Sequence, residues 1–168
     1  MMDRERAYFG EALAALQARF GDGVAALGLP IGEEAGFHGV VDLLAMKAYV
    51  YSGGAGKGAE QPIPDELQAA AEEAREKLVD RVAEADDALL EKYLEGSELT
   101  QAEITSALQA AVAAGTVSPV LPVSATKNIG IDRLLEMALS VPSPAARGAR
   151  TVLAGTSGTD EVELPVDI

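Results

Sequence analysis

A long helical pattern between residues 65 and 93 constrains the fold of this chain more than any other feature of its sequence. Apolar residues advance along it by three or four positions and so line one helix face: Leu67, Ala71, Ala74, Leu78, Val82, Ala85, Leu89 and Tyr93. We predict that this face packs on a sheet. Asp86 is a candidate cap for a break near the middle, so the pattern fits either one bent helix or two helices.

Three short segments upstream of that pattern are rich in β-branched and aromatic residues. They predict strands at residues 24–32, 37–43 and 46–51. The glycine-rich residues 52–62 predict a flexible loop. Ahead of the strands, apolar residues at helical spacing predict a first helix from Glu5 to Phe20, which Gly21 ends.

Downstream of the long pattern, Thr100 and Glu103 fit a capping box, in which hydroxyl and carboxylate satisfy each other's backbone amides. We predict that the helix they open runs to Ala114 and ends at Gly115. A strand and a last helix are then predicted at residues 117–123 and 129–139.

Residues 145–168 are rich in Gly, Ala and Thr and show no period, which predicts a linker toward a further domain. Of the whole chain, 48% is apolar, enough for a real core. The elements together predict a mixed α/β (α+β) fold, in which strand-loop-helix segments flank a helix-rich part with a short β-sheet.

The charge of the chain is strongly negative, with 13 Lys and Arg against 27 Asp and Glu, a formal net charge of −14. Such a surface repels nucleic acid and anionic lipid and attracts basic partners, so we expect neither direct nucleic-acid binding nor membrane binding. The chain has no cysteine, which excludes disulfides, thiolate metal ligands and a thiol nucleophile. Without an apolar run of ~20 residues or a signal peptide, we interpret the protein as soluble and cytoplasmic.

No catalytic or metal-ligating constellation is recognisable. The loop around Lys57 resembles a phosphate-binding loop, but Tyr51 stands where that motif needs its first Gly, and Gly58 where it needs Ser or Thr. We interpret it as a mobile surface hairpin loop. His38, the only histidine, has no Ser, Asp or metal-spaced partner set around it and is interpreted as structural.

A second, acidic stripe follows the same long pattern: Glu73, Glu76, Asp80, Glu84, Asp87 and Glu91. At ~100° per residue, Asp80 points about 200° away from Val82, to the face opposite the core. Basic residues four positions after these acids are scarce, although Lys77 and Arg81 interrupt the charge. The stripe is therefore either a solvated helix face or a docking site for a basic partner.

Three separate signatures occur in this chain in order. "GVVDLLAMKA" lies within residues 29–51, "EKYLEGSELT" within residues 63–104 and "SATKNIG" within residues 119–144. In these passages the chain resembles bacterial translation elongation factor G or a close elongation-factor-G-like paralogue. The resemblance covers most of residues 3–144.

The resemblance implies part of a guanine-binding site. In this family a Ser-Ala-x-Lys loop closes over the guanine base, which assigns Ser124, Ala125 and Lys127 to that loop. The family's Asn-Lys-x-Asp motif falls at the N-terminus, where Met1 replaces the Lys and Asp3 takes the Asp position that accepts from the guanine ring. The phosphate loop, Mg²⁺ ligands and switch regions of the family have no counterpart in this chain. We therefore expect no catalytic residue, metal ligand or cofactor here, and GTP and Mg²⁺ in the intact parent.

The same resemblance implies a division of the chain. Residues 1–20 and 117–144 would be the C-terminal part of the GTPase domain, residues 21–116 the insertion often called G-prime, and residues 145–168 the linker. The family's insertion contacts the C-terminal domain of the ribosomal stalk protein through acids that correspond here to Asp80, Glu84 and Asp87.

The reading that results is a fragment of a cytoplasmic, ribosome-dependent GTPase acting in translocation of tRNA and mRNA. Two alternatives stay open. One is a piece of another translational GTPase, of the ribosome-protection or release-factor-three type. The other is a free-standing acidic interaction module without nucleotide binding, in which residues 124–130 are only a turn.

Overall fold

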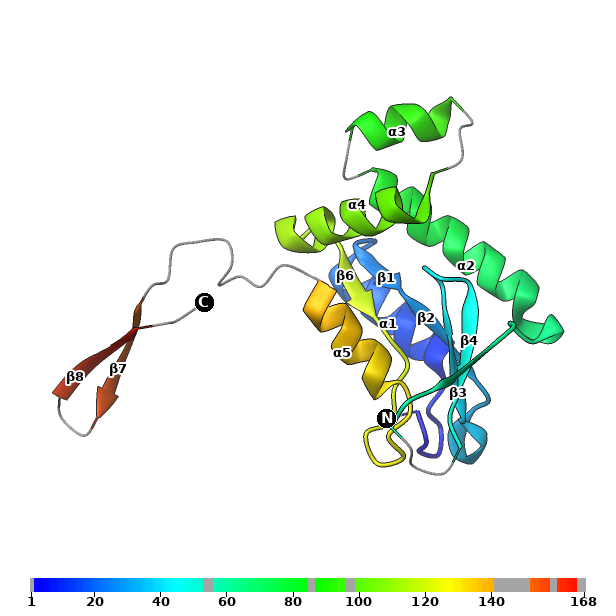
Figure 1. The fold of residues 1–168 in the computed structure, drawn as a ribbon, viewed down its shortest axis with the longest axis horizontal. Helices are drawn as coiled ribbons and strands as arrows, with labels where there is room; N and C mark the ends of the chain where they lie inside the picture. The colour runs from blue at the N-terminus through cyan, green and yellow to red at the C-terminus, as the bar shows by residue number, and fades with distance from the viewer. Residues whose placement is uncertain are drawn as a thin grey trace.

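The structure is a computed structural model that describes residues 2–52, 56–84, 87–95, 99–140, 152–157 and 160–165. For Asp87, Ala88, Leu94 and the two segments after residue 151 it describes the backbone alone. Helices surround small β-sheets (Figure 1), which confirms the predicted mixed α/β (α+β) class.

A parallel pair of strands joins two segments that are far apart in the sequence. Strand β1 (Val24–Ala26) pairs with β6 (Ser118–Val120), with Val24 opposite Ser118. Helix α1 (Phe9–Phe20) precedes β1 and contacts it, and helix α5 (Ile131–Ser140) follows the loop after β6. Strand β6 lies in the segment 117–144, whereas β1 lies just inside residues 21–116, the part expected to be an insertion.

Helix α1 begins at Phe9, so the predicted start at Glu5 is wrong by one turn. The chain before the helix is bound to the segment that follows β6, because the Met2 amide donates to the Val123 carbonyl at 3.0 Å. The left-handed φ of 60° at Arg6 is also incompatible with a helix. The predicted end is confirmed, since the Gly21 amide donates to the Gln17 carbonyl at 2.8 Å.

The second sheet is antiparallel and has four strands in the order β2-β3-β4-β5. Their bounds are Gly28–Ile31, Gly39–Asp42, Lys47–Val50 and Ala59–Gln61. Strand β5 was not predicted, because all three of its residues are exposed and its sequence lacks an apolar alternation. It is held by backbone pairing with β4 and by the ion pair between Lys47 and Glu60 at 2.5 Å.

Leu27 divides the single strand predicted at residues 24–32 into two strands. Its amide donates to the Val120 carbonyl at 2.9 Å, while its own carbonyl accepts from the Leu43 amide at 3.1 Å. The chain therefore leaves the parallel sheet and enters the antiparallel sheet at one residue.

The long helical pattern forms two helices, α2 (Asp65–Ala83) and α3 (Asp87–Leu94). The predicted apolar face is confirmed in α2, where Ala71, Leu78 and Val82 are buried. Arg75 fixes α2 to the sheet through hydrogen bonds from its guanidinium to the carbonyls of Leu43 and Leu44 at 2.5 and 2.7 Å. The suggested cap at Asp86 lies outside the described residues.

Helix α4 (Gln101–Ala114) has the predicted bounds and both predicted ends. Thr100 and Glu103 make the reciprocal bonds of a capping box, and Gly115 ends the helix with a left-handed φ of 77°. Ile104, Leu108 and other side chains of α4 are buried, and the helix packs against α2.

Two clusters of buried apolar side chains make the core. The larger one joins the sheets to α2 and α4 through residues such as Leu43, Leu78 and Leu108. The smaller one lies under the N-terminal segment and the loop after β6, and includes Met2, Phe37 and Ile129. This second cluster supports the region where the candidate guanine residues lie.

Strands β7 (Val152–Ser157) and β8 (Asp160–Pro165) form an antiparallel hairpin in the segment expected to be an aperiodic linker. The expectation of an aperiodic segment is wrong for these two strands, whereas the linker role stays a prediction. The alternation of Glu161, Val162, Glu163 and Leu164 was the available signal. Residues 145–151 lie outside the description. Among the described residues, no helix combines the length and apolar character that crossing a bilayer requires.

Candidate functional site

The structure brings Asp3 together with the loop after β6, although they are more than a hundred positions apart in the sequence. The hydroxyl of Ser124 donates to Asp3 Oδ1 at 2.6 Å, and the hydroxyl of Thr126 donates to Asp3 Oδ2 at 2.8 Å. Two of the residues assigned by resemblance, Asp3 and Ser124, are therefore in direct contact. Thr126 was not predicted, although it stands within the same loop motif.

The loop itself is a tight, well-bonded turn. Ser124 and Ile129 exchange backbone hydrogen bonds at 2.9 Å in both directions, which brings the two ends of the turn together. The buried Ser124 hydroxyl also accepts from the Lys127 amide at 3.2 Å. Ala125, Thr126 and Lys127 are exposed, so a ligand could approach their backbone from solvent.

Gly130 is required where the loop enters α5. Its φ is 75°, and a Cβ there would lie 2.9 Å from the Pro122 carbonyl oxygen. A larger residue would push the turn away from the end of β6.

The carboxyl of Asp3 is held in its ionised form. Hydrogen bonds from Ser124 and then Thr126 lower its pKa from 3.8 to about 2. A carboxylate offers roughly four acceptor positions. Two hydroxyl donors leave capacity to accept from a base that presents neighbouring N–H groups, as guanine does.

Lys127 is engaged within the protein. Its ammonium donates to the carbonyl of Ala35 at 2.8 Å, a residue of the short 3-10 helix η1 (Glu34–Gly36) between β2 and β3. Sequence reasoning gave no signal for this contact, because the two residues are 92 positions apart and belong to different predicted parts of the chain.

The acidic stripe is exposed along α2 and at the residue that ends it, as predicted for Glu73, Glu76, Asp80 and Glu84. The Asp87 side chain lies outside the description. Two basic residues pair with acids of the stripe, Lys77 with Glu73 and Arg81 with Glu84, both at 2.6 Å, and of these two only Lys77 stands four positions after its acid. The short spacings of a helix surface, three and four positions, make both pairs possible.

Asp80 has an aromatic partner. A hydrogen bond to Asp80 is the main reason that the pKa of Tyr93 is raised. Asp80 therefore connects α2 to α3 across the break in the long pattern.

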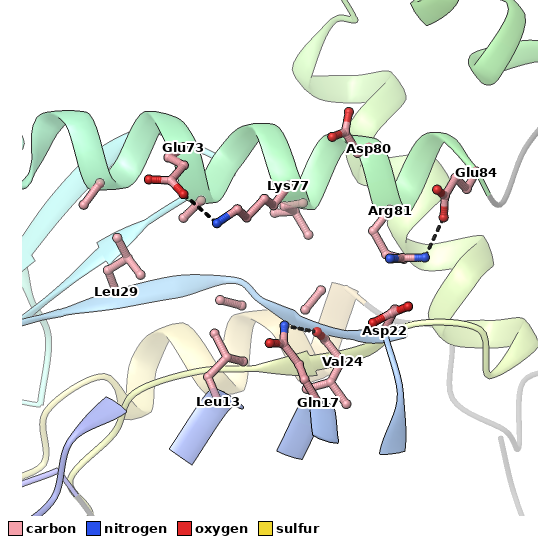
Figure 2. A pocket seen from close by; sticks show the side chains of 15 residues that line it. Leu13, Gln17, Asp22, Val24, Leu29, Glu73, Lys77, Asp80, Arg81 and Glu84 are labelled. Carbon is pink, nitrogen blue, oxygen red and sulfur yellow. Dashed lines mark hydrogen bonds and ion pairs between the residues drawn. The ribbon is translucent and has the colours of Figure 1, made fainter. Parts of the chain in front are cut away.

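A groove of about 490 Å³ runs between α2 on one side and α1 and β1 on the other. Figure 2 shows Leu13 and Leu29 along its wall, and Lys77 and Arg81 extending from α2. Gln17 fixes the wall by donating to the Val24 carbonyl at 3.0 Å. The predicted docking residues Asp80 and Glu84 both line this groove, so the stripe has an apolar surface beside it.

The loop around Lys57 connects β4 to β5, as expected for a hairpin loop, and the Lys57 side chain is exposed. His38 is also exposed, and its Nδ1 lies 2.7 Å from the Gly36 carbonyl oxygen. Within the part of the chain that is described, no three His, Asp or Glu side chains gather as a candidate metal site.

No protein-family model matches the chain. Its fold is similar to part of a solved bacterial structure. The crystal structure of ttk003000868 from Thermus thermophilus superposes with a TM-score of 0.74 and 33% sequence identity. The match covers 83% of this chain but only 21% of the Thermus chain, so the present chain spans about a fifth of that protein.

Proposed function

We propose that this chain is part of a ribosome-dependent translational GTPase of the elongation factor G type, acting in the cytoplasm in translocation of tRNA and mRNA. The observation that carries the proposal is the contact of Asp3 with Ser124 and Thr126. A carboxylate with a lowered pKa faces a Ser-Ala-x-Lys turn in which Ala125, Thr126 and Lys127 are exposed, and these are the two groups that recognition of a guanine base requires.

The phosphate half of such a site has no candidate among the described residues, since the glycine loop at Lys57 leads into β5 and not into a helix. The chain's own contribution is therefore binding. Asp3, Ser124, Ala125 and Lys127 would hold the base, while GTP and Mg²⁺ belong to the intact parent.

The second part of the proposal is that α2 docks the basic C-terminal domain of the ribosomal stalk protein. Asp80 and Glu84 line the groove beside α1 and β1, and Asp87 follows at the start of α3. The pairing of Glu84 with Arg81 does not remove the negative charge of the whole surface, because the chain carries −14 overall. A basic partner would be steered toward it in a salt-dependent manner.

The test is a low-salt calorimetric titration of the full chain with the isolated C-terminal domain of the stalk protein. The doubly reversed variant Asp80→Lys with Glu84→Lys should bind at least roughly tenfold more weakly. The control reverses Glu72 and Glu95 to Lys, two exposed acids that do not line the groove. Equal losses of affinity in both variants would show that binding depends only on net charge. No binding by the unsubstituted chain would refute the docking proposal.

A further inference from the structure

The 3-10 helix η1 contacts both segments that form the candidate guanine site, the N-terminal segment that carries Asp3 and the loop after β6. On one side, Glu34 Oε1 accepts from the Arg6 amide at 2.7 Å, three residues after Asp3. On the other side, the Ala35 carbonyl accepts from the Lys127 ammonium at 2.8 Å. One short turn of the predicted insertion therefore lies between the N-terminal segment and the loop after β6.

The backbone is strained at the same place. Among the described residues, non-glycine positions with left-handed φ are Arg6, Glu34, Met46 and Asn128, at 60°, 50°, 51° and 54°. Three of these four belong to the N-terminal segment, η1 and the loop. Such conformations persist only where surrounding contacts enforce them, and they concentrate at binding sites.

A second part of the insertion supports the loop from the β4–β5 connection. The φ of 69° at Gly56 favours glycine, and a Cβ there would lie 2.8 Å from Nδ2 at the end of the Asn128 side chain, which would have to shift. The amide of Gly58 donates to Asp132 Oδ2 at 3.1 Å, and the Tyr51 hydroxyl donates to Asp132 Oδ1. The loop and the first turn of α5 are thus held against the antiparallel sheet.

We infer that η1 is a positioning element for base recognition, in which Glu34 and Ala35 set the place of Asp3 relative to Lys127. The ligand class is a purine base that presents a ring N–H and an amino group to the Asp3 carboxylate. The inference rests on the proposed function for its ligand, but the positioning itself is a property of the free chain. Glu34 binds the N-terminal segment and the adjacent Ala35 binds the loop after β6. A displacement of η1 would therefore disturb both contacts.

The experiment compares Glu34→Ala with the conservative Glu34→Gln in the full chain, using amide hydrogen exchange resolved by NMR. Glu34→Ala should speed exchange of the Ser124 and Ile129 amides by roughly tenfold or more, since local opening becomes easier. Glu34→Gln keeps an acceptor for the Arg6 amide and should retain most of the protection. Glu33→Ala, a neighbouring exposed acid, is the matched control and should leave the exchange of the Ser124 and Ile129 amides unchanged.

Tyr8 supplies a spectroscopic signature for the same contact. The charge of Glu34, followed by its hydrogen bond, raises the pKa of the Tyr8 hydroxyl. That pKa should fall toward its ordinary value in both Glu34 variants, whereas exchange at Ser124 should respond strongly only in Glu34→Ala. The Tyr8 pKa then reports the loss of the Glu34 charge, and the exchange of the Ser124 amide reports the displacement of the loop.

Saturation-transfer NMR with guanosine tests guanine binding separately from the positioning role of η1. Unchanged exchange at Ser124 and Ile129 in Glu34→Ala would overturn the positioning role, whether or not guanosine binds. Faster exchange in a chain that shows no guanosine signal would uphold positioning and refute the proposed guanine function. Faster exchange together with a weaker guanosine signal supports both.

Discussion

Asp3 accepts hydrogen bonds from Ser124 and Thr126, and its behaviour in acid follows from those two contacts. Its pKa is about 2 in the folded chain against an ordinary 3.8, so the folded state binds the proton more weakly than the unfolded state. A depressed pKa stabilises the fold above the ordinary value, and this contribution is lost as the pH falls through the folded value.

We therefore predict that folding stability falls between about pH 4 and pH 2, partly through Asp3. Glu103 contributes in the same direction, because Lys92 and Thr100 lower its pKa from 4.5 to about 2. The measurement is urea unfolding as a function of pH for the parent chain and Asp3→Asn, with carbon NMR titration of the Asp3 carboxyl. The variant should lose less stability across this range, and an identical pH dependence would show that the Asp3 contacts do not form.

Helices α2 and α3 share one sequence pattern but differ in burial. Leu78 of α2 is 2% exposed, whereas Leu89 of α3 is partly buried against the same cluster. The apolar face of α3 at Leu89 is therefore less enclosed than the apolar face of α2 at Leu78. Periodicity predicts which face is apolar, but the depth of burial depends on what packs on it.

We expect Leu78→Ala to lower the free energy of unfolding by about 2–5 kcal/mol, because it leaves a cavity in the core. Leu89→Ala should cost on the order of 1 kcal/mol, since its side chain already meets solvent. Leu139, which is 86% exposed, offers a matched Leu→Ala control with little effect. Chemical denaturation with a shared slope measures all three, and equal costs at Leu78 and Leu89 would contradict the burial difference.

The molecule is organised around segments that meet from opposite ends of residues 2–140. Strand β1 pairs with β6, and Asp3 meets the loop that follows β6. The antiparallel sheet and helices α2 to α4 lie between these segments in sequence. The chain passes from one sheet to the other at Leu27, because the amide and the carbonyl of this residue form hydrogen bonds to different sheets.

For the chain as a unit, we predict no GTP hydrolysis above a protein-free blank, with Mg²⁺ present. Phosphoryl transfer needs a phosphate cradle and metal ligands, and a base-facing carboxylate with a loop supplies neither. Phosphate release measured on highly purified chain tests this, with Lys57→Ala as the companion variant. Turnover that is lost in Lys57→Ala would contradict the prediction and would assign a phosphate role to the β4–β5 loop.

Local patterns in the sequence were sufficient for elements that depend on near neighbours. The capping box at Thr100 and the stop at Gly115 predicted α4 with correct bounds, and helical spacing identified Leu78 and Val82 as core. Strand β5 and the division at Leu27 could not be predicted, because exposed strands and sheet changes are specified by pairing partners distant in sequence.

The sequence by itself determined the apolar and acidic faces of α2, the ends of α4 and the presence of a Ser-Ala-x-Lys turn, because each depends on spacing along one segment. Only the tertiary structure decided that Asp3 meets Ser124, that Lys127 is bound by Ala35 and that the acids of α2 line a groove. These contacts join residues separated by long stretches of chain. Their formation depends on loop closure and packing of the whole core, for which no local pattern carries information.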